Sequence, residues 1–206
     1  MKDENLDITR LVLASGNQGK LRELSALFGQ HGIEVVPQSK FASEDAEETG
    51  LSFLENALLK ARHAAEKSGL PAVGDDSGLM VDALDGAPGI YSARYAGPTA
   101  SDQDNLEKLL AEMMGIPEEN RRAQFVCVMA MVRHATDPLP LFCQGIWTGH
   151  ILDTPRGEGG FGYDPVFHVP NHNCSAAELD PQTKNSLSHR GQALENLLEK
   201  FRQPLP

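Results

Sequence analysis

The sequence is poor in cysteine and in long apolar runs. Its three cysteines, Cys127, Cys143 and Cys174, show no Cys-x-x-Cys spacing and are odd in number, so a disulfide framework is not expected and the thiols are predicted to be reduced. No apolar run approaches the roughly 18 residues that a membrane-spanning helix needs. The segment from Met1 to Arg10 also lacks the charged-then-apolar pattern of a signal peptide. These absences favour a cytoplasmic location and no membrane partner.

Basic residues are also scarce. The chain has 18 lysines and arginines against 29 aspartates and glutamates, which gives a net charge of −11. Proteins that wrap duplex nucleic acid neutralise its phosphates with lysine and arginine, so this balance argues against a nucleic-acid partner. Nucleotides remain possible ligands. An acidic protein that handles a triphosphate needs local positive charge and a divalent cation to offset its own carboxylates.

What the chain does contain is enough apolar sequence for one large domain. It has 206 residues, of which 40% are hydrophobic. Helical and strand-like patterns alternate along it, which predicts an α/β fold: a long mixed β-sheet with flanking helices, and two lobes around a central cleft into which the polar loops converge. We expect residues 1–10 to be an N-terminal extension and residues 11–206 to form a single domain. The predicted helices cover 21–28, 53 to near Gly69, 106–113 and 186–201, and Ser101 or Asp102 is expected to cap the third. The predicted strands cover 33–36 and, as a hairpin, 125–132 and 139–147.

A glycine-bearing loop between a predicted strand and helix is the first candidate site. Leu11 to Ala14 is apolar, and Ser15, Gly16, Asn17, Gln18, Gly19 and Lys20 follow before the helix begins. Backbone N–H groups at a helix N-terminus, with a lysine beside them, favour a phosphate group. The spacing is not that of a P-loop, because only two residues separate Gly16 from Gly19. A tight turn with a solvated lysine is the alternative interpretation.

Paired carboxylates form the second candidate site. Asp75 and Asp76 follow the short apolar segment Ala72 to Gly74, which predicts that they lie at a strand edge. Adjacent residues on extended chain point to opposite faces, so one aspartate can face a cleft while the other orients its surroundings. Glu47, and with less support Glu48, are further candidate metal ligands. A turn with a helix or bulge cap is the alternative for the two aspartates, and favourable charge near a helix start is the alternative for the two glutamates.

Two segments near the C-terminus complete the candidate residues. In the glycine-rich segment 157–165, which contains Phe161, Gly162, Tyr163 and Asp164, the two aromatic rings offer a flat surface on which a planar base can stack, and the glycines permit close backbone approach. Lys184, His189 and Arg190 place donors at the start of the last predicted helix, where they suit a carbonyl or phosphate oxygen. A packed loop and a solvated basic turn are the alternatives. His168, His172 and Cys174 lack a fourth ligand and a known spacing, so zinc is not expected.

Taken together, these segments resemble one family. The sequence letters at 15–20, 47–57, 74–79, 86–97, 159–165 and 188–191 are similar, in order, to the motifs of the inosine/xanthosine triphosphate pyrophosphatases, in the bacterial dITP/XTP pyrophosphatase branch. The resemblance runs from Leu11 to about Phe201. It implies Mg²⁺-dependent hydrolysis of deaminated purine triphosphates (dITP, ITP and XTP) to the monophosphate and pyrophosphate, by a homodimer that cleanses the nucleotide pool.

The resemblance also implies residue roles. Asp76 is similar to the family's general base, and we expect Asp76 and Glu47 to bind the metal. Ser15 to Lys20 are expected to hold phosphates and Ser77 to contact the substrate. Phe161 to Asp164 are expected to line the nucleoside site, and Lys184, His189 and Arg190 to complete the contacts. The alternatives are a pyrophosphatase for other modified nucleotides and a non-catalytic nucleotide sensor, although a sensor has no need of Asp75 and Asp76.

Overall fold

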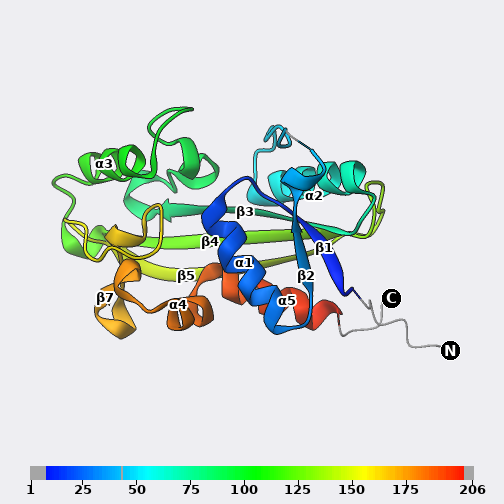
Figure 1. Ribbon diagram of the computed structural model, residues 1–206. Helices are drawn as coiled ribbons and strands as arrows, with labels where there is room; N and C mark the ends of the chain where they lie inside the picture. Colours follow the sequence, from blue (N-terminus) through cyan, green and yellow to red (C-terminus); the bar gives the residue numbers. More distant parts are fainter. Residues whose placement is uncertain (1–7, 43, 202–206) are drawn as a thin grey trace. The chain divides into compact units, whose positions relative to one another are not determined.

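The computed structural model describes residues 8–42 and 44–201, so most of the predicted N-terminal extension lies outside the described residues. Within the described part of the chain, helices and strands alternate as the sequence patterns predict (Figure 1). The strands are β1 (Arg10–Ala14), β2 (Glu34–Pro37), β3 (Ala72–Val81), β4 (Arg122–Val132), β5 (Leu141–Ile151), β6 (Phe167–Val169) and β7 (Cys174–Ser175). The α-helices are α1 (Gln18–Gln30), α2 (Phe53–Ser68), α3 (Asp102–Glu112), α4 (Pro181–Leu187) and α5 (His189–Phe201).

The strands form one mixed sheet with the order β2-β1-β3-β4-β5-β6-β7. β1 pairs in parallel with β2 and with β3, whereas β6 pairs antiparallel with β5 and β7. β4 and β5 are neighbours joined by a short loop, and such a connection is too short for a parallel crossover. The predicted α/β class, with its mixed sheet and hairpin, is therefore confirmed.

The chain divides into two compact units, each made of separate stretches of sequence. Unit 1 comprises Met1–Asp76, Cys127–Gly145 and Arg190–Pro206. Its strands have apolar side chains on both faces. On one face α1 and α5 pack on the sheet around Leu13, Phe28 and Leu197, and on the other α2 packs through Ala61 and Ala65. Figure 1 shows α2 and α5 on opposite sides of the strands, so this unit has three layers.

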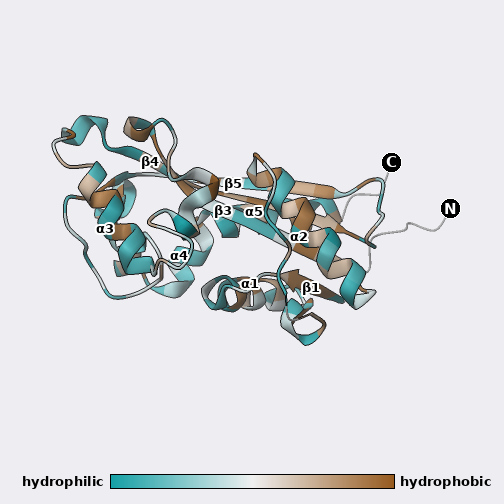
Figure 2. Ribbon diagram, turned by 90° about the horizontal axis from the view of Figure 1, so that it is seen from above, coloured by the Kyte–Doolittle hydropathy of each residue, from teal (hydrophilic) through white to brown (hydrophobic). Residues whose placement is uncertain are grey.

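Unit 2 comprises Ser77–Val126 and Ile146–His189. Its core joins α3 to the strands through Leu79, Leu109, Trp147 and Phe167. Ser101 caps α3 through a reciprocal capping box with Asp104, which confirms one of the two predicted caps. Figure 2 shows hydrophobic residues along the strands and hydrophilic residues on the outer side of α3, as expected for an amphipathic helix.

Two sequence-based boundaries are wrong. Asp75 and Asp76 lie within the single ten-residue strand β3 rather than at its edge, because their side chains find polar partners on each face of the sheet. The helix predicted over 186–201 is two helices, since Ser188 is extended at φ −67° and ψ 156° between α4 and α5. Lys184 therefore lies in the last turn of α4, and only His189 and Arg190 begin α5.

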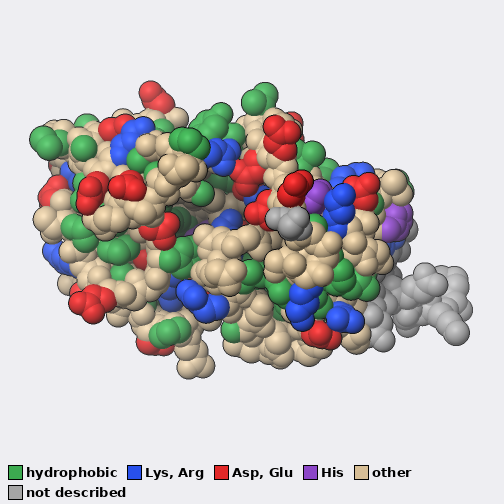
Figure 3. Space-filling model, turned by 45° about the horizontal axis from the view of Figure 1, so that its top comes forward, with side chains coloured by type: hydrophobic (Ala, Val, Ile, Leu, Met, Phe, Trp, Pro, Cys, Tyr) green, Lys and Arg blue, Asp and Glu red, His purple; other side chains and the backbone are tan. Residues whose placement is uncertain are grey.

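The surface matches the acidic composition. On the face drawn in Figure 3, the lysine and arginine side chains form separate small groups among the aspartates and glutamates. Among the described residues, no helix is both long enough and apolar enough to cross a membrane.

Candidate functional site

The phosphate-binding loop predicted at 15–20 joins β1 to α1 in unit 1. Asn17 caps α1, because its side-chain oxygen accepts a hydrogen bond from the Lys20 backbone N–H at 3.0 Å, and the Asn17 N–H donates to Ser15 Oγ at 3.2 Å. Gly16 and Gln18 are exposed, whereas Gly19 is buried. The first turn of a 13-residue helix thus opens at an exposed loop, which is the geometry that favours an anion.

Asp75 lies beneath this loop and holds its lysine. The residue is 1% exposed, and its Oδ1 lies 2.5 Å from Lys20 Nζ. Burial alone would raise the pKa of Asp75, but the Lys20 ammonium and the Arg190 guanidinium together hold it well below its ordinary range. Asp75 is therefore a permanent anion between two cations that the sequence assigned to substrate.

Arg190 belongs to the same unit and has a second acidic partner. It is buried, and its Nη1 lies 3.0 Å from Glu23 Oε2 on α1. Glu23 and Asp75 thus fix a guanidinium that opens α5, where a cation would otherwise oppose the helix dipole.

Asp76 points to the other face of β3, toward α2. Its Oδ1 lies 2.6 Å from Lys60 Nζ, and Asn56 Nδ2 donates to its Oδ2 at 3.4 Å. Burial raises the pKa of the Asp76 carboxyl above its ordinary value, and the Lys60 ammonium opposes that rise only in part. The prediction that the two aspartates face opposite sides is confirmed, and a carboxylate with a raised pKa is suited to accept a proton.

Lys60 links Asp76 to a second carboxylate. The sequence patterns did not identify Lys60 as a site residue. Its Nζ lies 3.0 Å from Glu48 Oε1, so one ammonium group contacts both acids. Its own pKa is raised: burial lowers it, but the charges of Asp76 and Asp75 more than offset that effect. The sequence feature that could have identified Lys60 is its i, i+4 spacing from Asn56, which places the two polar residues together beside the apolar face of α2.

The structure brings Glu48, rather than Glu47, into this network. Glu47 is exposed, and Glu48 is half-buried against Lys60. Both residues lie in the loop before α2, whose backbone conformation the sequence pattern did not reveal. The two carboxylates that share Lys60 are therefore Asp76 and Glu48.

In unit 2, Asp164 and Lys184 form a buried ion pair. Lys184 Nζ lies 2.7 Å from Asp164 Oδ2, and both residues are less than a tenth exposed. The same oxygen accepts the Phe161 N–H at 2.8 Å, and the Lys184 ammonium lies 5.1 Å from the centre of the Phe161 ring. These contacts hold three of the predicted residues together and shape the loop that carries Phe161.

The remaining predicted residues of unit 2 differ in exposure. Tyr163 is buried, and its hydroxyl donates to the Ser92 carbonyl at 2.8 Å, so its ring supports the core. His189 is also buried and stacks on Phe125, with 4.8 Å between ring centres. Phe161, Gly162 and Ser77 are half-buried, and the Gly162 N–H donates to Asp102.

The boundary between the units falls within two of the motifs. Asp76 and Ser77 are consecutive residues, as are His189 and Arg190, and each pair is divided between unit 1 and unit 2. The phosphate loop, both aspartates, Glu48, Lys60 and Arg190 belong to unit 1, and the Phe161 loop, Lys184 and His189 belong to unit 2. The single cleft predicted from the sequence stays a prediction.

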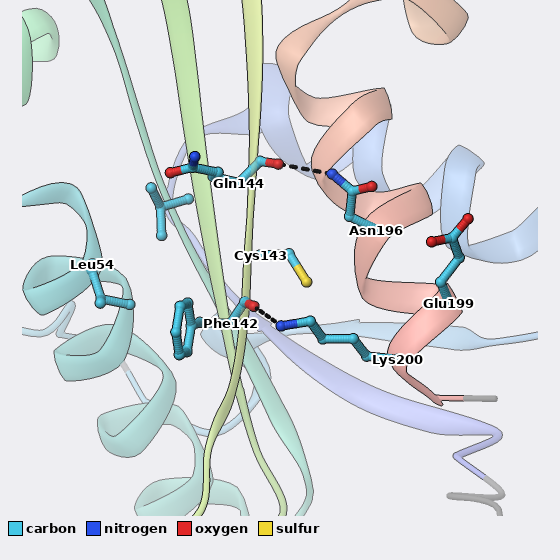
Figure 4. Close-up of a pocket in the computed structure, with 8 residues that line it drawn as sticks. Leu54, Phe142, Cys143, Gln144, Asn196, Glu199 and Lys200 are labelled. Atoms are coloured by element: carbon cyan, nitrogen blue, oxygen red, sulfur yellow. Dashed lines mark hydrogen bonds between the residues drawn. The ribbon is translucent and has the colours of Figure 1, made fainter. Parts of the chain in front are cut away.

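A separate cavity of about 530 Å³ in unit 1 contains none of the predicted site residues. Its lining includes Leu54, Phe142 and Cys143 together with three polar residues of α5 (Figure 4). The Asn196 amide donates to the Gln144 carbonyl at 2.9 Å, and Lys200 Nζ donates to the Phe142 carbonyl at 2.8 Å. The two donors bind carbonyl groups along β5, and the lining includes none of Asp75, Asp76 and Lys60, so this pocket is separate from the acidic site.

Comparison with known proteins supports the family resemblance that the motifs indicate. A profile of the Ham1 family matches residues 11–200. A dITP/XTP pyrophosphatase from Vibrio parahaemolyticus is 59% identical over 93% of this chain and 96% of its own length. A dITP/XTP pyrophosphatase from Yersinia pseudotuberculosis is also 59% identical, over 94% of this chain and 98% of its own length.

Solved structures agree with the sequence comparison. A HAM1 protein from Coxiella burnetii is similar with a TM-score of 0.85 and 50% identity, covering 93% of this chain and 98% of its own. The Ham1 protein of Staphylococcus aureus gives a TM-score of 0.80 and 44% identity, covering 93% of this chain and 97% of its own. The order of the motifs, the mixed sheet and these matches lead to one conclusion: the chain belongs to the Ham1 family.

Proposed function

We propose that this chain hydrolyses dITP, ITP and XTP to the nucleoside monophosphate and pyrophosphate, and so removes deaminated purines from the nucleotide pool. The observation that carries the proposal is the position of Asp76 in β3. Its carboxylate has a raised pKa and contacts Lys60, and the residue before it, Asp75, contacts Lys20 of the phosphate loop. Relatives at 59% identity that are named dITP/XTP pyrophosphatases support the same reaction.

In this mechanism Asp76 removes a proton from the water that attacks phosphorus. Lys60 and Asn56 hold its carboxylate in place, and the raised pKa makes it a better proton acceptor than an ordinary aspartate. Lys20 and the N-terminus of α1 bind phosphate oxygens and stabilise the charge of the departing pyrophosphate. Asp75 keeps the Lys20 ammonium in position for that role.

The acidic residues also suit the magnesium ion that this reaction requires. Mg²⁺ prefers carboxylate and phosphate oxygens, and Asp76 and Glu48 both contact Lys60 Nζ, so their oxygens lie close together. Among the described residues no group of three such ligands is formed, which fits an ion completed by the triphosphate and water. When bound, the ion neutralises phosphate charge and polarises the phosphorus centre.

Glu48 and Glu47 provide a matched test of the metal ligands. We expect Glu48→Gln to raise the Mg²⁺ concentration for half-maximal activity by about tenfold, equivalent to roughly 1.4 kcal/mol. Glu47→Gln should leave it nearly unchanged, because Glu47 is exposed. Binding of Mn²⁺, followed by electron paramagnetic resonance, gives the same comparison without turnover. Equal effects of the two variants would contradict the assignment of Glu48.

We assign the selectivity for the purine base to hydrogen-bond donors in the second half of the chain. The 6-oxo group of hypoxanthine and xanthine accepts hydrogen bonds where the 6-amino group of adenine donates them. Donors from His189 or from backbone amides of unit 2 would be left unpaired by adenine, and a site built on such donors can reject the wrong base by as much as ~10⁴. We expect kcat/KM to be far higher for dITP and XTP than for dATP, and equal values for dITP and dATP would contradict this account.

Pyrophosphate release from a panel of triphosphates, with and without Mg²⁺, tests the proposed function as a whole. Mg²⁺-dependent release from dITP and XTP supports it. Faster release from modified pyrimidine triphosphates would favour a different pyrophosphatase. Binding of dITP without release would favour a nucleotide sensor.

We also propose that the chain acts in the cytoplasm as a homodimer. The cytoplasm holds the nucleotide pool, and the dimer is the state that the family resemblance implies. Leu54 and Phe142 supply an exposed apolar surface on unit 1, at 37% and 52% exposure, which supports an association with a second copy. Light scattering at micromolar concentration should give twice the chain mass. Phe142→Glu should shift it toward the monomer, and a monomeric wild-type chain would contradict the dimer.

A further inference from the structure

The buried thiol of Cys127 contacts the same carboxylate that holds Lys20. Cys127 lies on β4 at 0% exposure, and its Sγ donates to Asp75 Oδ2 at 2.9 Å. The other carboxylate oxygen, Oδ1, lies 2.5 Å from Lys20 Nζ. One carboxylate therefore connects a rigid sheet position to the lysine of the phosphate loop.

A second contact on Asp75 has a physical reason. The terminal torsion of an aspartate is broad, so each partner narrows the range of its carboxylate plane, and the thiol adds a directional contact to the charges of Lys20 and Arg190. A lysine side chain is long and flexible, with a large rotamer entropy to lose on ordering. A thiol is a weak donor, but its hydrogen bond strengthens when the acceptor is an ionised carboxylate. With Oδ2 anchored to β4, the Oδ1 atom offers Lys20 one defined position.

We propose that Cys127 is a positioning residue that places the Lys20 ammonium for triphosphate binding by fixing the carboxylate of Asp75. The inference rests on the proposed function, in which Lys20 binds phosphate oxygens. Cys127 itself touches no substrate, and its effect passes through Asp75. Sequence patterns offer no sign of this role, since a cysteine in an apolar strand is typical of ordinary core packing.

Substitution by serine and by alanine separates hydrogen bonding from packing. Both side chains are smaller than cysteine, but only serine keeps a donor. We expect Cys127→Ala to raise KM for dITP roughly three- to tenfold with kcat changed less than about twofold, and Cys127→Ser to restore most of the affinity. Cys143→Ala is the matched control, because Cys143 is also buried against the same core. Equal KM increases in Cys127→Ala and Cys127→Ser would overturn the proposal.

Binding of inorganic tripolyphosphate, measured by calorimetry, makes the test independent of catalysis. Tripolyphosphate should bind the wild-type chain and Cys127→Ser more tightly than Cys127→Ala. If the wild-type chain releases no pyrophosphate from dITP but shows this thiol dependence, the proposed function fails and the positioning role stands. If dITP is hydrolysed and all variants bind tripolyphosphate equally, the positioning role fails alone.

The hydrogen bond itself has a spectroscopic signature. A Cys143→Ala, Cys174→Ser double variant leaves Cys127 as the only thiol, so its S–H stretch is read directly by Raman spectroscopy. We expect a lower frequency in the folded protein than in the same variant unfolded in urea, because donation to a carboxylate weakens the S–H bond. An unchanged frequency would show that the thiol makes no such bond and would overturn the proposal.

Discussion

Gly74 of β3 lies directly against the backbone of α2, so its replacement by alanine should be costly. A Cβ atom at position 74 would lie 2.0 Å from the Ala57 carbonyl oxygen and 2.8 Å from the Ala61 nitrogen, against an ordinary contact of 3.4 Å or more. Both neighbours are backbone atoms, so no side chain can rotate away. The helix must move from the strand by more than an ångström, or the strand must bend.

The expected cost follows from this overlap. Overpacking a core costs typically about 1–3 kcal/mol, and a backbone clash belongs at the upper end. A loss of about 3 kcal/mol would lower Tm by roughly 6–12 °C in a chain of this size. Lys60 and Asn56 lie on the same turns of α2 and contact Asp76. Because a misplacement of about 1 Å can cost ~10² in rate, kcat/KM should fall roughly 10- to 100-fold.

Urea unfolding and dITP turnover measure the two effects, with Gly29→Ala as the matched control. Gly29 lies within α1 and is exposed, and a Cβ atom added there would meet no atom within 4 Å beyond its own helix. Alanine should therefore stabilise the protein there by about 0.5–1 kcal/mol through helix propensity. If Gly74→Ala changed the free energy of unfolding by less than ~0.5 kcal/mol, the close packing of α2 on β3 would be refuted.

Three further predictions each concern a substitution that removes a single contact. Lys60→Met removes the charge that opposes the raised pKa of Asp76, so the acidic limb of the pH profile of kcat/KM should move to higher pH. An unmoved profile would disprove the pairing. Asp137→Ala removes a buried carboxylate that accepts hydrogen bonds from Arg133, which hold its pKa well below its ordinary range. Because the folded-state pKa is the lower one, urea unfolding should show a loss of about 1–3 kcal/mol at pH 7 that shrinks as the pH falls below ~4. A loss independent of pH would contradict this interpretation. Ser52→Ala removes the N-cap of α2 and should cost about 1 kcal/mol in the same assay, and no loss would show that the cap is dispensable.

The local pattern of the chain was enough to predict most helices and strands. The second predicted helix ends as expected, with Gly69 in the left-handed conformation at φ 69°. The strand β3 was harder to predict, because Asp75 and Asp76 are poor strand formers whose partners come from distant residues. The break between α4 and α5 at Ser188 could not be predicted either, because apolar residues recur at helical spacing on both sides of it.

The candidate site likewise contains residues that the local sequence predicts and residues that only the folded structure reveals. The phosphate loop and both aspartates could be predicted because their chemistry is local to a short motif. Lys60 and Cys127 could not, because each acts through a side chain that lies close only in the folded sheet and helices. The preference for Glu48 over Glu47 depends on the backbone path of one loop, and sequence spacing alone carries no information on it.

The central claim is that Asp76 accepts the proton of the attacking water, and Asp76→Asn tests it most directly. Asparagine keeps the size of the side chain and removes its basicity. The rate kcat for dITP should fall by ~10²–10⁴, the usual contribution of a general base, while the affinity for dITP changes only a few-fold. Turnover within about tenfold of the wild-type rate would contradict the account.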